Sequence, residues 1–197
     1  ESWGDFLWWE KLGMILAMGI CWGGLGINVA HELGHRLTKW EQQLSKALLL
    51  TSLYMHFFIE HNRGHHKNVS TPLDPASARL GEWIYAFYFR TVIGSFRSAW
   101  HLEKIRLERS GLPVWSWKNE MLRFQIIQLL FIALIGFVFG PVGFVAFLLS
   151  AIIGILLLET VNYIEHYGLR RRELEPGIFE KVKPTHSWNS DHTLGRI

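Results

Sequence analysis

Three stretches of this chain carry histidine in patterns that could bind a metal ion. They are residues 31–35 (HELGH), 60–66 (EHNRGHH) and 162–168 (NYIEHYG). In the first two stretches histidines stand four residues apart, so a helix would place both imidazoles on one face. Neutral imidazole suits iron, copper, zinc and nickel alike, so the ligand type predicts a metal centre without choosing the metal. The predicted ligands are His31, His35, His61, His65, His66 and His166.

Six imidazoles exceed the needs of one tetrahedral zinc site, which suggests two metal ions or one very rich site. Carboxylates stand close to the histidines in sequence, and metal-bound imidazoles usually donate their second N–H to such a group. The acidic residues expected in this supporting role are Glu32, Glu60, Asp74 and Glu165. Glu159 and Asn162, within two helical turns of His166, could serve in the same way.

The remaining histidines are interpreted differently. His56 lies in an apolar segment and His101 in an amphipathic one, so both are expected to be ordinary hydrogen-bonded or interfacial side chains. For His186 and His192 two interpretations stay open, because each could support a metal ligand or simply face water.

Long apolar runs must position these residues. Residues 124–158 contain no charged residue, and Gly140-Pro141 in the middle predicts a tight turn. The run is expected to form two membrane spans, 124–139 and 142–158. A further span is expected at 12–30, where Gly19-x-x-x-Gly23 would allow close helix packing in lipid.

Two other apolar segments are not expected to cross the membrane. Residues 47–59 are too short to span, and 83–100 resemble an interfacial helix whose Arg90 and Arg97 could reach lipid headgroups. Of the 20 Lys and Arg residues, 19 follow residue 30, whereas residues 1–11 carry a net charge of −2. The positive-inside rule therefore places all three histidine stretches on the cytoplasmic side, provided that 47–59 does not cross.

The expected fold is all-α: an integral membrane helical bundle with a cytoplasm-facing, histidine-rich di-metal site. Residues 1–197 are expected to form a single partial membrane domain, because the chain begins at Glu1 rather than at methionine. Membrane orientation explains the basic charge, so nucleic acid is not an expected partner. Cys21 is the single cysteine, which excludes a thiolate metal cluster and an internal disulfide.

In their residues, order and spacing, these motifs resemble those of the membrane-bound alkane 1-monooxygenase (AlkB) family. The resemblance rests on residues 31–36 (HELGHR), 60–66 (EHNRGHH) with 71–79 (TPLDPASAR), and 162–170 (NYIEHYGLR). Residues 186–192 (HSWNSDH) resemble the segment that precedes the family's last histidine box, of the form HSDHH. That box is absent here, so the chain is interpreted as a fragment lacking it and is expected to be inactive alone.

The resemblance implies a bacterial inner-membrane enzyme with two iron ions (Fe2+/Fe3+) held by the six histidines on its cytoplasmic side. It implies insertion of one oxygen atom of O2 into the terminal methyl group of medium-chain n-alkanes, giving 1-alkanols. Electrons would come from rubredoxin and its NAD(P)H-dependent reductase. An alkane offers no acidic proton and no polar group, which agrees with redox rather than acid–base chemistry.

Three alternatives remain open at this point. A related histidine-box hydroxylase or desaturase could act on aromatic or acyl chains, although desaturases typically show H-x-x-H-H rather than the H-x-x-x-H-H of residues 61–66. An intramembrane zinc protease could use His31, Glu32 and His35, because H-E-x-x-H also matches that class. A metal carrier is disfavoured, since the predicted spans contain no Glu or His.

Overall fold

The computed structural model describes residues 5–188, which are mostly helical and divide into two compact units. The first unit contains the described residues up to Phe58 together with Glu103–Leu158, and the second contains Ile59–Leu102 and the described residues from Glu159. Each unit is described by itself. Helices α6 (Ile84–Arg109) and α7 (Glu120–His166) contribute residues to both units.

The first unit begins with one continuous helical stretch. It comprises α1 (Trp8–Ile20), the π-helical segment η2 (Cys21–Ile27) and α2 (Asn28–Gly34). Helix α3 (Lys39–Thr51) then packs against α2, and the buried Ser45 hydroxyl donates to the Ala30 carbonyl across 2.6 Å. This contact fixes the end of α2 that carries His31.

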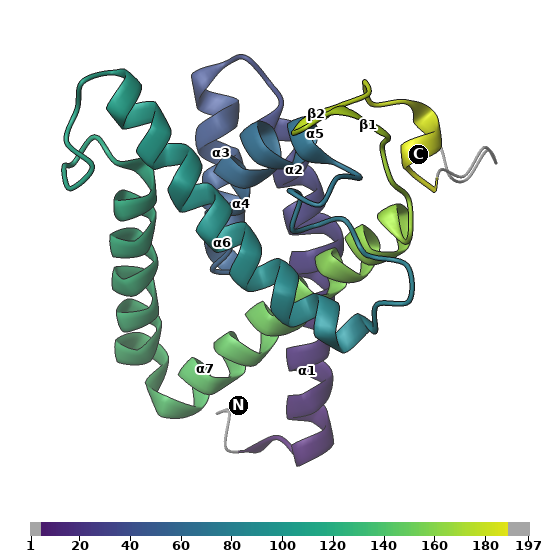
Figure 1. Ribbon diagram of the computed structural model, residues 1–197. Helices are drawn as coiled ribbons and strands as arrows, with labels where there is room; N and C mark the ends of the chain where they lie inside the picture. Colours follow the sequence, from purple (N-terminus) through teal and green to yellow (C-terminus); the bar gives the residue numbers. More distant parts are fainter. Residues whose placement is uncertain (1–4, 189–197) are drawn as a thin grey trace. The chain divides into compact units, whose positions relative to one another are not determined.

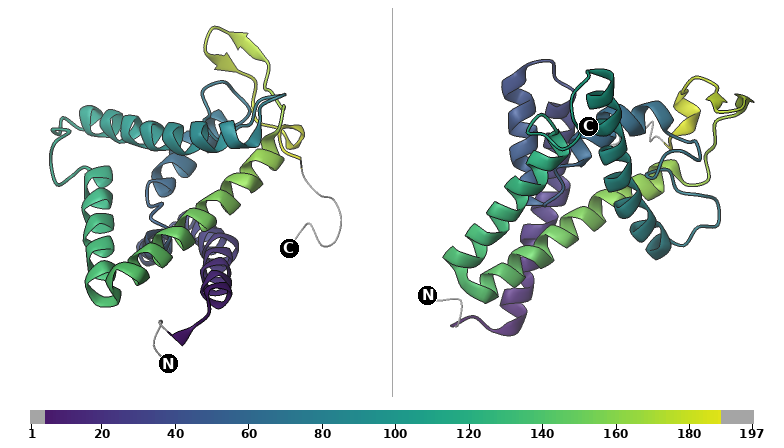
Figure 2. Two further views of the ribbon diagram at one scale, coloured as in Figure 1. Left: turned by 90° about the horizontal axis from the view of Figure 1, so that it is seen from below. Right: turned by 60° about the vertical axis from the view of Figure 1, so that its left-hand side comes forward.

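The second unit contains the shorter elements. These are α4 (Phe57–Glu60, whose first turn begins in the first unit), the π-helical turn η3 (His61–His65), α5 (His66–Asn68), strands β1 (Glu173–Glu175) and β2 (Ile178–Phe179), and η4 (Pro184–His186). The two strands form a small antiparallel hairpin that precedes η4 (Figure 2). An irregular loop, residues 69–83, connects α5 to α6.

Within residues 5–188, two helical stretches are long and apolar enough to cross a membrane: Trp8–Gly34 and Glu120–His166. The second of these, α7, bends sharply into two arms (Figure 1). The bend lies at Gly140, whose φ of 67° and ψ of −175° belong to a region that favours glycine. The turn predicted at Gly140-Pro141 is therefore confirmed.

The apolar segment 47–59 is not one helix. Helix α3 ends at Thr51, the chain turns through Leu53 at a φ of 54°, and α4 begins only at Phe57. A non-glycine residue at positive φ is uncommon, and here it marks the point where the helical path is interrupted.

The glycine motif of the first helical stretch makes close backbone contacts with α7. A Cβ atom built on Gly23 would lie 2.7 Å from the Gly154 carbonyl oxygen, and one on Gly19 would lie 2.6 Å from Ile153 Cβ. The small residues predicted to allow close approach therefore do so within the first unit.

Replacing Gly23 by alanine is expected to destabilise the protein. Overpacking costs about 1–3 kcal/mol, which exceeds the gain of about 1 kcal/mol that alanine has over glycine in a helix. Gly24 is the matched control, because its Cβ would meet Leu157 Cδ2 at an ordinary 3.9 Å. Thermal unfolding in detergent should show a lower midpoint for Gly23→Ala and no decrease for Gly24→Ala. Equal midpoints for the two variants would contradict the close contact between Gly23 and Gly154.

Helix α6 presents an exposed apolar stripe, Tyr85, Phe89 and Ile93, as expected of an interfacial helix. The two arginines expected to reach lipid headgroups differ, however. Arg97 is exposed, whereas the Arg90 side chain is only 24% exposed and pairs with Glu82 at 2.6 Å. The expectation that Arg90 reaches lipid headgroups is therefore wrong, because its donors are used within the second unit.

Candidate metal centre

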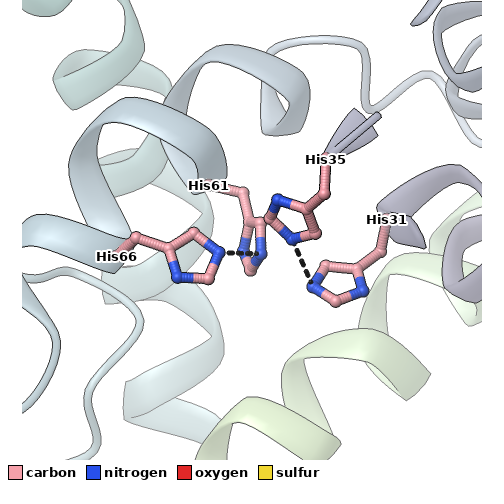
Figure 3. A group of neighbouring side chains, drawn as sticks. All are labelled: His31, His35, His61 and His66. Carbon is pink, nitrogen blue, oxygen red and sulfur yellow. Dashed lines mark hydrogen bonds between the residues drawn. The ribbon is translucent and has the colours of Figure 1, made fainter. Parts of the chain in front are cut away.

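The first unit holds one histidine pair. His31 lies in α2 and His35 caps its end, and their Nε2 atoms are 3.1 Å apart (Figure 3). The Nδ1 atom of His31 lies 3.3 Å from a carboxylate oxygen of Glu32, whose side chain is 66% exposed. A carboxylate in this position favours the tautomer with the proton on Nδ1, in which Nε2 would be the atom that binds a metal.

The second unit holds another pair, which the i, i+4 spacing did not indicate. That spacing predicted His61 and His65 side by side, as they are, but the Nε2 atom of His61 lies 3.0 Å from that of His66 (Figure 3). The reason is the π-helical turn η3, in which the backbone N–H of His66 donates to the His61 carbonyl and aligns residues five apart. His65 stacks beside His61, as the i, i+4 spacing predicted, with ring centroids 5.2 Å apart.

Gly64 makes the tight packing of this turn possible. A Cβ atom there would lie 2.5 Å from a carboxylate oxygen of Glu60 and 3.1 Å from Leu102 Cδ1. The sequence carried a signal for the unusual turn in this glycine between histidines, but a glycine alone does not identify a π-helix.

His65 is held by Asp74. Its Nδ1 atom lies 3.0 Å from Asp74 Oδ2, and the carboxylate also accepts from the Ser77 hydroxyl and the Ala76 N–H. Burial raises the pKa of Asp74, but the bonds from His65 and Ser77 outweigh it and lower that pKa overall. An ionised Asp74 requires the proton on Nδ1, which leaves Nε2 of His65 as the nitrogen for a metal.

The same charges act on His65 itself. Burial lowers the pKa of His65, yet the hydrogen bond and charge of Asp74 raise it overall. A raised pKa favours the imidazolium form, and a metal ion at this imidazole would have to displace its Nε2 proton, so metal binding would weaken as the pH falls.

His166, at the end of α7, is oriented by backbone. Its Nδ1 atom donates to the His186 carbonyl at 3.3 Å, and its ring centroid lies 5.0 Å from that of His65. His186 is itself buried, and its carbonyl also accepts from the Ser70 hydroxyl. Of the two interpretations left open for His186, the structure supports the one in which it holds another histidine.

The other predicted acidic residues lie in different surroundings. Glu60 is buried and accepts from the Ser98 hydroxyl, and burial followed by repulsion from Asp74 raises its pKa to about 7. Glu165 accepts from the Ser187 hydroxyl at 2.7 Å. Glu159 accepts from Thr91 and Asn162. These carboxylates form hydrogen bonds with hydroxyl and amide donors, whereas Glu32 and Asp74 lie directly beside imidazoles.

The histidines excluded from the predicted site occupy other environments. His56 is buried against the Tyr54 ring, and burial lowers its pKa to about 4, so it is neutral. His101 is exposed on α6. His192 lies outside the described residues.

The geometry of each pair fits a metal ion. Two nitrogens bound to one metal at about 2.1 Å, with an angle of 90–110°, lie roughly 3.0–3.4 Å apart. The Nε2 atoms of His31 and His35, and those of His61 and His66, are separated by 3.1 and 3.0 Å. Each of these four histidines offers a ring nitrogen that an ion could bind.

Comparisons with known proteins add to this geometry. Residues 7–197 match the family model described as fatty acid desaturase. The alkane 1-monooxygenase of Pseudomonas putida is 44% identical over 190 residues, covering 96% of this chain and 47% of that protein. The alkane 1-monooxygenase 1 of Alcanivorax borkumensis is 45% identical over 189 residues, covering 95% and 46%.

A more distant relative has a different substrate name. The xylene/toluene monooxygenase hydroxylase component of Pseudomonas putida is 29% identical over 187 residues, which is 95% of this chain and 49% of that protein. The chain thus spans about half the length of the curated relatives that it matches.

Proposed function

We propose that this chain, which belongs to the fatty acid desaturase family, is part of a membrane di-iron monooxygenase that hydroxylates n-alkanes. The enzyme would insert one oxygen atom of O2 into the terminal methyl group of a medium-chain alkane. The observation that carries the proposal is the 44% identity, over 96% of the chain, to a protein named alkane 1-monooxygenase.

We propose that two iron ions are held by the six histidines of the three sequence stretches. The near-contact of Nε2 atoms within each pair supports this assignment for four of them. The other two, His65 and His166, each have Nδ1 engaged with an acceptor, so Nε2 is available in both. When bound, the irons would supply the activation of O2, chemistry that no side chain of this site provides.

Asp74 is proposed to hold the ligand His65 in its metal-binding tautomer, and Glu32 to support His31 more weakly. The difference rests on exposure, because the Asp74 side chain is fully buried whereas that of Glu32 is 66% exposed. Glu165 is proposed to contribute negative charge near a site whose imidazole ligands are neutral. Glu60, whose raised pKa of about 7 leaves it only partly ionised, is proposed to contribute such charge once a cation lies nearby.

We propose spans at 12–30, 124–139 and 142–158, with 47–59 remaining on one side of the membrane. The break between α3 and α4 supports the last assignment. The distribution of Lys and Arg then orients the histidines to the cytoplasm, in the inner membrane of a bacterium. Residues 1–197 would accordingly form one partial domain of the enzyme.

The proposed reaction is balanced by external electrons and protons: RH + O2 + 2 electrons + 2 protons give ROH and H2O. Rubredoxin, reduced by its NAD(P)H-dependent reductase, is the proposed electron donor. The basic residues that follow residue 30 offer charge complementarity to an acidic donor of this kind.

A second candidate differs only in substrate. The 29% identity to a xylene/toluene monooxygenase hydroxylase component supports hydroxylation of xylene or toluene as this second candidate. The H-x-x-x-H-H spacing of residues 61–66 bears on how a metal is held and not on the substrate, so this motif does not choose between the two.

The test uses the full-length protein in membranes, with rubredoxin, its reductase and NADH. We expect conversion of octane to 1-octanol that requires O2 and reductant, together with about two irons per protein. A mixture of octane, xylene and an acyl chain distinguishes the candidates by product. Zinc in place of iron, with peptide cleavage that Glu32→Gln abolishes, would instead indicate the protease alternative.

A further inference from the structure

The loop of residues 69–83 determines where Asp74 lies, and it is irregular along its whole length. Ser70 adopts a positive φ of 57°, and its N–H donates to the Ser77 hydroxyl at 2.7 Å. The same hydroxyl donates to Asp74 Oδ2 at 2.5 Å. The position of Asp74, and with it that of His65, therefore depends on what holds the backbone of this loop.

Arg90 on α6 forms hydrogen bonds with that backbone. Its Nη1 donates to the Pro75 carbonyl at 2.9 Å and its Nη2 to the Ser77 carbonyl at 3.0 Å. These two carbonyls flank Ala76, whose N–H binds Asp74 Oδ1. The guanidinium thus holds the turn from Pro75 to Ser77, from which two donors reach the Asp74 carboxylate.

The guanidinium is itself fixed by Glu82. Its Nε and Nη2 donate to the two carboxylate oxygens at 2.6 and 2.7 Å, a bidentate arrangement, and the second oxygen also accepts from the Arg79 N–H. The Glu82 side chain is 11% exposed. Four guanidinium N–H bonds are therefore committed, in a planar fork that a lysine ammonium cannot reproduce.

One helical turn after Arg90, close packing also holds the loop against α6. A Cβ atom on Gly94 would lie 2.7 Å from Pro75 Cβ, so α6 and the loop are in direct contact there. The loop has no freedom to move away from α6 while both contacts persist.

We propose that Arg90 is a positioning residue for the metal centre: it fixes the Pro75–Ser77 turn, which holds Asp74 against His65. The inference rests on the proposed role of His65 as a metal ligand. Arg90 would touch neither metal nor substrate, and its effect would pass entirely through Asp74.

The test measures binding of Co2+ alone to the full-length, metal-free protein, followed by visible absorption. Outer-shell partners of metal ligands typically contribute about 10–100-fold in affinity. Arg90 contacts the turn that holds Asp74 and does not contact a metal ligand, so we expect a smaller effect: Arg90→Gln and Arg90→Lys should weaken Co2+ binding by roughly 3–10-fold. Arg97→Gln, on the exposed side of the same helix, is the matched control and should leave binding unchanged.

A cycle with Asp74→Asn separates positioning from general destabilisation. If Arg90 acts through Asp74, adding Arg90→Gln to Asp74→Asn should weaken Co2+ binding less than about twofold further. Unchanged binding in Arg90→Gln, wild-type binding in Arg90→Lys, or an equal loss in the Asp74→Asn background would each overturn the inference. If Arg90→Gln does not accumulate, Arg90→Lys carries the same cycle.

These outcomes are distinct from those of the proposed function. Weaker Co2+ binding by the Arg90 variants of a protein that hydroxylates no alkane would retain the inference and reject the function. If the protein hydroxylates octane but the Arg90 variants bind Co2+ as tightly as the wild type, the function is retained and the inference is rejected. A wild-type protein that binds no Co2+ would overturn the inference, because no metal site would exist to be positioned.

Discussion

Replacement of His65 by alanine is expected to abolish octane hydroxylation and to lower iron affinity by more than about 100-fold, since even partners outside the ligand shell account for about 10–100-fold. The imidazole is buried, and its Nδ1 is engaged by Asp74, so that Nε2 is its proposed metal-binding atom. Iron content of the purified full-length protein and octanol formation are the measurements.

Alanine at this position also leaves the buried Asp74 carboxylate without its imidazole partner, a change that can destabilise the fold by itself. His65→Asn addresses this point, because its side-chain amide can still donate to Asp74 while nothing replaces Nε2. We expect His65→Asn to insert into the membrane normally and yet to bind little iron. His101→Ala, at an exposed position on α6, is the control and should retain iron and activity. Wild-type iron content in His65→Asn, or an empty site in His101→Ala, would show that the histidines have been assigned wrongly.

Asp74→Asn is expected to lower iron affinity by about 10–100-fold, whereas Glu32→Gln is expected to lower it by less than about threefold. Both carboxylates lie beside an Nδ1 atom, at 3.0 and 3.3 Å, but water screens only the exposed Glu32. Iron binding measured by competition with a chelator gives both values. A larger effect of Glu32→Gln would contradict this ranking and would favour a direct chemical role for Glu32.

Features that depend on local chemistry were predictable from the sequence. Gly140 followed by proline, in the middle of an uncharged run, predicted the bend that α7 makes. Gly19 and Gly23 predicted a close helix contact, and the backbone of Gly154 provides it. In both cases the absence of a side chain is itself the requirement, so the residue type carries the information.

Features that depend on the path of the backbone were not predictable in the same way. An α-helical period pairs His61 with His65, but η3 widens by one residue and pairs His61 with His66. Arg90 was predicted to be interfacial from the pattern of residues 83–100, but its binding partners lie in an irregular loop that no periodicity describes. The role of His186 rests on its carbonyl oxygen, a group that every residue possesses.

The hydrogen bonds that hold Asp74 against His65 join residues close in sequence. Asp74 is 9 residues from His65 and 3 from Ser77, and Arg90 is 15 and 13 residues from the two carbonyls that it binds. Short separations keep the entropic cost of loop closure small, so these contacts do not depend on distant parts of the chain. His166 joins only when a segment about a hundred residues downstream of His65 has been synthesised. The nascent chain can therefore position the His65 imidazole before His166 exists, and the metal centre is expected to gain its His166 ligand only after the end of α7 has been synthesised.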